Sequence, residues 1–280
     1  MTLSAVTDTE EVGAEWCAPS FIDVASACSR YQMAKPFPYL VLDNLFDTND
    51  LQEIIEKIKE VSAQSWEPHY TQLQKKRVIQ READMPCAVA EYFRQVHSAA
   101  FCHFLKQVTG EVALVADPEL WGGGVHEVDS NGHFEIHVDF QVHPIKRMKN
   151  TVVVITYLNP EWEEGDGGEL ELWDARTRRR EVRIAPLFGR TLIMSQSSIA
   201  LHGYPSPLKS GKRRALISYF YRPAQTSSDP FLTNTHYLRH TGLPLDRQIH
   251  MLLRDHLPQP VISALRHVQS RLVHRWKQRG

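Results

Sequence analysis

The sequence predicts an α+β, mainly β fold: a double-sheet jelly roll with supporting helices before it and a helical extension after it. Three observations lead to this prediction. Short β-rich runs alternate with turn residues over 122–223, helical apolar spacing precedes them, and it returns near the C-terminus. Regularly spaced short strands are typical of an antiparallel sandwich or barrel, and a jelly roll suits their number.

The β-rich runs are separated by Gly, Asn, Ser and Pro, which favour turns. A first strand is expected over 36–43, where prolines precede an apolar run. The later strands are predicted over 124–128, 133–140, 151–158, 168–173, 181–184, 191–195 and 213–221.

Two helices are predicted between the first strand and the β-rich region. The earlier begins after candidate N-caps at 48–50. Its apolar residues recur at helical spacing: Leu51, Ile54, Ile55, Ile58 and Val61. The later one spans about 86–108 and ends at Thr109-Gly110, since glycine commonly terminates a helix.

The chain divides into three expected parts. Residues 1–35 form a loosely ordered lead-in, 36–225 the jelly roll with its supporting helices, and 226–280 a helical extension. The extension carries an apolar stripe with basic residues around it: Ile262, Leu265, Val268, Leu272 and Trp276. Such a helix can bind a membrane surface or a partner, but docking on its own domain is the simpler interpretation.

Composition bounds the function. The 280 residues are 42% hydrophobic and 23% charged, with a formal net charge of -1, which is ordinary for a globular protein. This balance argues against nucleic acid or a membrane as partner. The N-terminus has no secretory signal and no run is long enough to span a membrane. Four cysteines without metal-motif spacing are expected to be reduced thiols of a cytoplasmic protein: Cys17, Cys28, Cys87 and Cys102.

The segment His137-Val138-Asp139 lies within a predicted strand. Side chains alternate between the faces of a strand, so His137 and Asp139 point the same way. With a third ligand from a distant strand they would form a 2-His-1-carboxylate facial triad, which leaves positions open for a cosubstrate and oxygen. The motif alone is weak evidence, because the chain contains 14 histidines.

His202 is the candidate third ligand. It follows the predicted strand at 191–195 and a short loop, 63 residues after Asp139, and the strands between allow the chain to return beside its start. His133 and His143 are rivals near the same strand. We interpret both as structural or substrate-facing residues.

Arginines begin the last predicted strand, at Arg213 and Arg214. A buried arginine requires an anionic partner, and the terminal carboxylate of 2-oxoglutarate suits a guanidinium. Strand parity alone does not choose between the two arginines.

The chain resembles the prolyl-4-hydroxylase-like branch of the 2-oxoglutarate/Fe(II)-dependent oxygenase superfamily over about 36–221. Several motifs in order carry the resemblance: Leu105-Lys-Gln-Val-Thr-Gly110, His137-Val-Asp139, Tyr157-Leu-Asn-Pro-Glu-Trp162, Gly167-Gly-Glu-Leu170, His202-Gly-Tyr-Pro205 and Arg213-Arg-Ala215.

The resemblance implies a double-stranded β-helix and a dioxygenase that uses Fe(2+), 2-oxoglutarate and O2, with ascorbate as reductant. It implies that His137, Asp139 and His202 are the catalytic metal ligands. It also implies that Arg213 and Tyr157 bind the 2-oxoglutarate carboxylate, and that Leu170 lines the apolar wall.

The sequence departs from the family pattern before the ligand strand. Many prolyl hydroxylases have a tyrosine there, whereas this chain has His126, which either substitutes as a donor or leaves the contact absent. Candidate substrate contacts are His126, Arg147 and Trp162.

The expected reaction is hydroxylation of an unactivated C–H bond, and the Asp139 carboxylate argues against halogenation. The family analogy implies peptidyl or free proline as substrate. A non-proline small molecule or a sugar-bearing intermediate is the alternative, and a non-catalytic jelly-roll binding module is the alternative of another class. Oligomeric state is left open.

Overall fold

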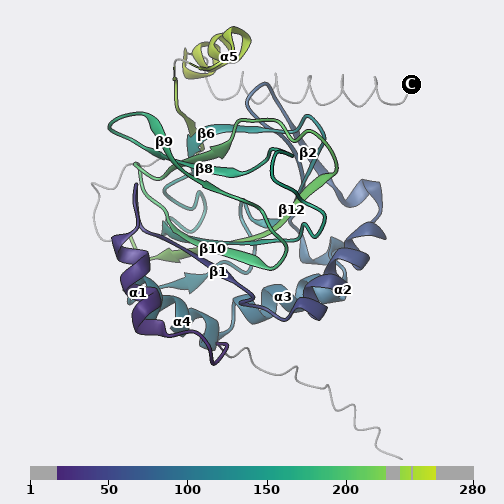
Figure 1. The fold of residues 1–280 in the computed structure, drawn as a ribbon, viewed down its shortest axis with the longest axis vertical. Coiled ribbons are helices and arrows are strands. Elements are labelled where there is room, and N and C mark those ends of the chain that lie inside the picture. Colours follow the sequence, from purple (N-terminus) through teal and green to yellow (C-terminus); the bar gives the residue numbers. More distant parts are fainter. Residues whose placement is uncertain (1–17, 225–233, 241, 257–280) are drawn as a thin grey trace, which may run out of the picture.

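Two antiparallel sheets face each other, and helices cover the outer side of the larger sheet (Figure 1). The computed structural model describes residues 18–224, 234–240 and 242–256, with side chains up to residue 251. Within these ranges every strand pair is antiparallel. This arrangement agrees with a jelly-roll-like architecture.

The larger sheet has eight strands within the described residues, seven of them in the order β1-β10-β7-β12-β5-β3-β2, with β4 paired to β12. Their bounds are β1 (Tyr39–Asp43), β2 (Glu67–Tyr70), β3 (Lys75–Ile79), β4 (Val115–Ala116), β5 (Gly124–Asp129), β7 (Lys149–Tyr157), β10 (Arg190–Ser195) and β12 (Lys212–Arg222).

The smaller sheet has five strands in the described part of the chain, in the order β13-β6-β11-β8-β9. Their bounds are β6 (Phe134–Val138), β8 (Leu170–Asp174), β9 (Arg179–Ile184), β11 (Leu201–Tyr204) and β13 (His236–Tyr237).

One apolar core lies between the two sheets. Alternate residues of β7 and β12 face it, including Ile155 and Tyr219, and Leu170 and Tyr204 approach from the smaller sheet. The pocket described below opens within this core, so the side chains that line it stand on paired strands.

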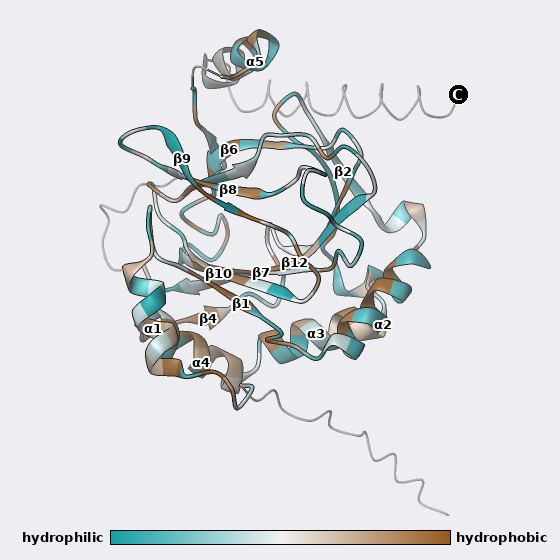
Figure 2. Ribbon diagram, in the orientation of Figure 1, coloured by the Kyte–Doolittle hydropathy of each residue, from teal (hydrophilic) through white to brown (hydrophobic). Residues whose placement is uncertain are grey.

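A second core separates the larger sheet from its helices. The helices are α1 (Val24–Met33), α2 (Thr48–Lys59), α3 (Cys87–Val96) and α4 (Ala99–Thr109). Buried hydrophobic residues of these helices pack with residues of the larger sheet in one cluster, and Figure 2 shows hydrophobic residues along the helices. In α2, Leu51, Ile54, Ile55 and Ile58 are all buried, and each contributes about 1.5–3 kcal/mol relative to exposure.

The predicted helix over 86–108 is two helices. His97 ends α3, and the Ser98 hydroxyl caps α4 by accepting the backbone N–H of Phe101. Gly110 closes α4 in the left-handed conformation, as predicted. The single-helix prediction was wrong because the apolar spacing continues across the break.

Several elements were not predicted. A helix, α1, lies inside the segment expected to be loosely ordered, with Asp23 as its N-cap. The hairpin of β2 and β3 was missed, and so was the short strand β11, on which His202 lies after the expected loop. After the sheets, α5 (Leu245–His256) follows. The apolar stripe from Ile262 to Trp276 lies outside the described residues.

Cys28, Cys87 and Cys102 are free thiols, and Cys17 lies outside the described residues. The helices within the described ranges fall short of the length and apolar character that a membrane-spanning helix requires.

Candidate active site

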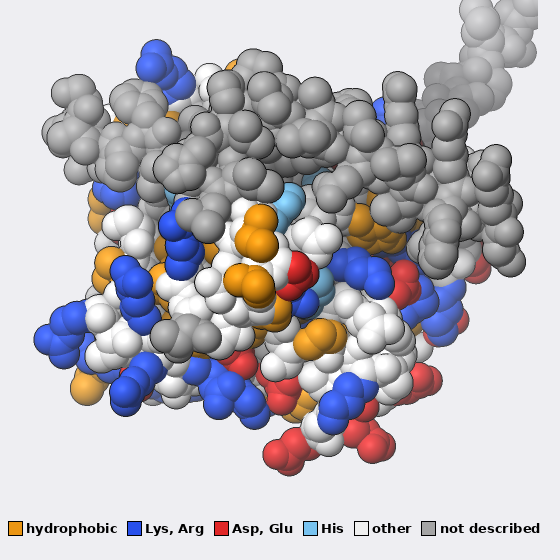
Figure 3. All heavy atoms as spheres, turned by 90° about the horizontal axis from the view of Figure 1, so that it is seen from above, with side chains coloured by type: hydrophobic (Ala, Val, Ile, Leu, Met, Phe, Trp, Pro, Cys, Tyr) orange, Lys and Arg blue, Asp and Glu red, His pale blue; other side chains and the backbone are white. Residues whose placement is uncertain are grey.

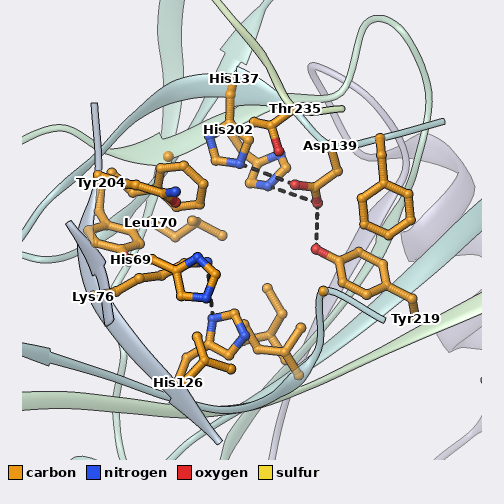
Figure 4. A pocket seen from close by; sticks show the side chains of 18 of the residues that line it. His69, Lys76, His126, His137, Asp139, Leu170, His202, Tyr204, Tyr219 and Thr235 are labelled. Atoms are coloured by element: carbon orange, nitrogen blue, oxygen red, sulfur yellow. Dashed lines mark hydrogen bonds and ion pairs between the residues drawn. The ribbon is translucent and has the colours of Figure 1, made fainter. Parts of the chain in front are cut away.

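Two neighbouring strands of the smaller sheet bring the predicted metal ligands together. His137 is in β6, Asp139 follows that strand, and His202 is in β11, directly opposite His137 in the register. Gly203 allows this close pairing, because a Cβ there would lie 2.8 Å from the Glu135 carbonyl oxygen. The three side chains are buried and point into one pocket (Figure 4).

The ligand atoms are close enough to share one metal ion. The His137 Nε2 lies 3.2 Å from Asp139 Oδ1, and the His202 Nε2 lies 3.5 Å from Asp139 Oδ2. Among the described residues, these three form a group whose ligand atoms all lie within 4.8 Å of one another. The geometry therefore fits the two imidazoles and one carboxylate of a facial triad.

The backbone fixes the orientation of both imidazoles. The Nδ1 atoms of His137 and His202 face the carbonyl oxygens of Glu135 and Ala200, at 2.7 and 2.9 Å. With the Nδ1 proton donated there, each Nε2 lone pair is directed into the pocket. The buried His137 Nε2 has no hydrogen-bond partner among the described residues, as a metal-ligating nitrogen requires.

Tyr219 supports the carboxylate. Its hydroxyl donates to Asp139 Oδ2 at 2.9 Å. Burial opposes ionisation of Asp139, but His202 and His137 outweigh it and hold the pKa well below its usual range. Tyr219 shares a face of β12 with Arg213 through strand parity. Strand alternation alone predicts that Tyr219 shares the face of Arg213, but Tyr219 was not among the predicted site residues.

Arg213 is buried at the inner end of β12. Its Nε donates to the Gly168 carbonyl oxygen at 2.8 Å, and its guanidinium lies 4.2 Å from the Tyr204 ring centre. No carboxylate among the described residues forms an ion pair with it. Gly168 leaves room for this side chain, since a Cβ there would meet Arg213 Cδ at 3.1 Å.

The other predicted cosubstrate residues lie beside Arg213. The Tyr157 hydroxyl is 3.4 Å from Arg213 Nη2, and burial raises the pKa of this phenol although Arg213 opposes the change. Leu170 lines the pocket wall. A buried cation, a phenol and an apolar wall fit one end of a dicarboxylic acid.

Arg214 faces the other side of the sheet. Its Nε donates to Glu127 Oε2 at 2.6 Å. Arg77 and Lys212 also pair with the Glu127 carboxylate. This arginine therefore has its anion within the protein, which sequence parity alone did not reveal.

The opposite side of the pocket carries residues that the sequence reasoning missed or left open. His126 lines it, with Nε2 3.2 Å from the Gly123 carbonyl oxygen. Lys76 Nζ lies 3.3 Å from His126 Nδ1. Lys76 belongs to the unpredicted β2–β3 hairpin, and the residues around it in the sequence did not indicate that it would face the pocket.

The remaining candidates lie elsewhere. Arg147 is exposed, and Trp162 donates to the Gly167 carbonyl oxygen at 2.9 Å, so neither lines the pocket. His133 faces the Gln72 carbonyl oxygen at 3.2 Å, in agreement with a structural role.

His143 belongs to a second group of possible ligands, with Asp117 and Glu119. Its Nδ1 accepts two backbone N–H groups, so its proton is on Nε2, which lies 3.6 Å from Asp117 Oδ2. The Asp117 carboxylate also accepts the Lys146 ammonium at 2.6 Å. The lone pair and charge that a metal would need are already used.

Residues 123–222 match the family model of the 2OG-Fe(II) oxygenase superfamily. Three solved structures have the same fold, at TM-scores of 0.52, 0.54 and 0.54. They are a prolyl-4-hydroxylase from Pseudomonas putida, a prolyl hydroxylase from Trichoplax adhaerens in complex with a peptide fragment of hypoxia inducible factor, and a 2OG-Fe(II) oxygenase family oxidoreductase from Burkholderia pseudomallei.

Sequence identities to these three are 12%, 15% and 13%. The alignments cover 72%, 71% and 76% of this chain and 99%, 90% and 100% of the other chains. Among curated protein sequences, none matches this chain. The ligand-bearing strands β6 and β11 fall within the matched region. The predicted resemblance to the 2OG-Fe(II) oxygenase superfamily is confirmed over residues 123–222, and this match indicates an oxidoreductase of the dioxygenase class.

Proposed function

We propose that the protein is an Fe(II)- and 2-oxoglutarate-dependent hydroxylase whose iron is held by His137, Asp139 and His202. The observation that carries this proposal is the convergence of two sites in one pocket. Three ligand side chains meet on one wall, and Arg213 enters the same pocket without a carboxylate partner among the described residues.

The bound iron and 2-oxoglutarate would supply the oxidation of an unactivated C–H bond. The protein's own residues bind and orient. Arg213 and Tyr157 would hold the distal carboxylate of 2-oxoglutarate, and Leu170 and Ile155 give the pocket apolar walls that exclude water. Tyr219 would fix the Asp139 carboxylate in position.

The proposed substrate centre is proline or a proline-like ring, peptidyl or free, with ascorbate as the reductant. This choice is supported by analogy with the solved structures, two of which are named as prolyl hydroxylases. A non-proline small molecule is the alternative within the same chemistry.

The test is succinate formation from 2-oxoglutarate by the purified protein with iron(II) and ascorbate, with and without prolyl peptides and free proline. We expect succinate above an Asp139→Ala control, and a product heavier by one oxygen atom in mass spectrometry. Succinate no higher than the control with all candidates would instead favour a non-catalytic binding module.

A further inference from the structure

The pocket contains more positive charge than its proposed contents require. Besides the metal ligands, its lining includes two cations, Arg213 and Lys76, whereas Asp139 is the one carboxylate among the described lining residues. On the outer face seen from above, basic and acidic side chains are both visible around the surface (Figure 3). The pocket differs in lacking such balance.

Lys76 is the unbalanced cation. Strand parity puts it on the inner face of β3 with Val78, whose cross-strand partner is His126. Its ammonium lies 4.6 Å from the Phe134 ring centre and 3.3 Å from His126 Nδ1. Within the described residues, no carboxylate lies within ion-pair distance of it.

His126 is oriented so that its Nδ1 accepts a hydrogen bond from the Lys76 ammonium. Its Nε2 faces the Gly123 carbonyl oxygen, so the proton is on Nε2 and the Nδ1 lone pair faces the Lys76 ammonium. Burial lowers the pKa of Lys76 to about 8, with Asp139 acting against the decrease. The ammonium form therefore still predominates at neutral pH and has further N–H donors to offer.

The Lys76 N–H donors lack an anion, as the sum of the charges in the pocket shows. An iron(II) ion with Asp139 is left with one positive charge, and a 2-oxoglutarate dianion with Arg213 is left with one negative charge, so these four cancel. Lys76 remains as one uncompensated cation that is partly buried, and withdrawing a charge from water is costly without a partner. In Figure 4 it lies with His126 across the pocket from the triad.

We propose that the substrate carries a free carboxylate and that Lys76 binds it, with His126 orienting the ammonium. This inference rests on the proposed function and narrows its substrate class to small carboxylic acids. Free proline belongs to this class, whereas a prolyl residue within a peptide has no free carboxylate. A single surplus charge matches a monoanion. The cavity, about 260 Å³, is just below the usual 300–1,000 Å³ range of ligand pockets, which favours a small compound.

The first experiment measures binding without turnover. Zinc-loaded protein with 2-oxoglutarate is titrated by calorimetry with small acids and their amides, beginning with L-proline and L-prolinamide and extending to other cyclic and acyclic pairs. We expect an acid to bind about 10- to 100-fold more tightly than its amide. A panel in which no acid exceeds its amide overturns the inference.

The second experiment uses Lys76→Met, which removes the charge and preserves the apolar stem. We expect this variant to lose the preference for the acid, and Lys76→Arg to retain part of it. Lys75→Met is the matched control, because Lys75 occupies the opposite face of β3. Equal acid preference in Lys76→Met and the control contradicts the proposal, provided that circular dichroism shows all variants folded.

A third measurement separates this proposal from the proposed function. Lys76→Met should leave 2-oxoglutarate affinity within about twofold of the unmodified protein. If it weakens 2-oxoglutarate instead, Lys76 is a cosubstrate residue and the carboxylate proposal fails while the hydroxylase proposal survives. Conversely, acid binding that depends on Lys76 without any succinate formation would support the anion site and contradict the hydroxylase.

Discussion

Two adjacent arginines of β12 lie on opposite faces of the larger sheet and have different partners. On the outer face Arg214 joins Arg77 and Lys212 around the Glu127 carboxylate. On the inner face Arg213 is buried against tyrosine rings without a carboxylate among the described residues. The outer cluster therefore contains its own anion, whereas we propose that a bound anion completes the inner one.

The largest effect is expected from the loss of a proposed metal ligand on the inner face. Replacing His202 by Ala removes one of the three proposed ligands, and we expect loss of stoichiometric iron and at least about a 100-fold decrease in succinate formation. Iron content is measured by elemental analysis after desalting. His133→Ala is the control, because it removes a buried imidazole outside the pocket; iron retained at full stoichiometry by His202→Ala would mean a different third ligand.

The difference between Arg213 and Arg214 is tested by replacing each of them with Ala. Arg213→Ala should raise the Michaelis constant for 2-oxoglutarate about 10- to 100-fold, because a charge-assisted contact to its carboxylate is lost. Arg214→Ala should change it less than about threefold. The reverse ranking would move the cosubstrate to the other face of the sheet.

The outer cluster is expected to affect stability without affecting cosubstrate binding. Glu127→Gln leaves Arg77 and Arg214 without their anion, whereas Lys212 keeps its ion pair with Asp129. We expect a loss of about 1–3 kcal/mol in the free energy of unfolding, reduced by the partial exposure of the cations. Urea denaturation measures it. An unchanged free energy of unfolding would mean that hydration stabilises these cations as well as the Glu127 carboxylate does.

The same variant has a pH signature. Burial raises the pKa of Glu127, but Lys212, Arg214 and Arg77 outweigh burial and lower it overall from 4.5. A lowered folded-state pKa means that the stabilisation is present above about pH 4.5 and is lost as the pH falls further. The stability difference between the protein and Glu127→Gln should therefore shrink below that pH; a difference constant down to pH 3 would contradict it.

The smallest effect is expected from Tyr219→Phe, which removes the hydroxyl that donates to Asp139. We expect about a tenfold decrease in iron affinity or turnover, at the low end for a residue that supports a metal ligand. Tyr221→Phe is the matched control on the same strand face, because its buried hydroxyl has no hydrogen-bond partner among the described residues. Equal behaviour of the two variants would show that the hydroxyl does not position Asp139.

Local patterns predicted much of the frame. Alternation and turn residues predicted the main strands, and strand parity predicted that His137 and Asp139 share a face. These features are encoded by neighbouring residues, so a single sequence reveals them. The break at Ser98 was missed because one capping hydroxyl ended a helix whose apolar spacing continues.

Other parts of the site depend on long-range pairing. Lys76 lies on a strand whose residues are mostly charged or polar, Lys75-Lys-Arg, so no apolar alternation marks it. It reaches the pocket because β3 pairs with β5, fifty residues later. The choice between Arg213 and Arg214 likewise required the register of β12 against β5, which places Glu127 opposite Arg214.

The short strand β13 has a consequence for how the protein matures. It pairs with β6 along the side away from β11, with Tyr237 opposite His137, and Thr235 and Tyr237 join the pocket lining. Every proposed iron and cosubstrate residue has been synthesised by Arg213, yet one wall is added more than twenty residues later. A chain that ends before residue 234 would therefore contain every proposed ligand but lack this wall, so the pocket is complete only after synthesis has passed residue 237.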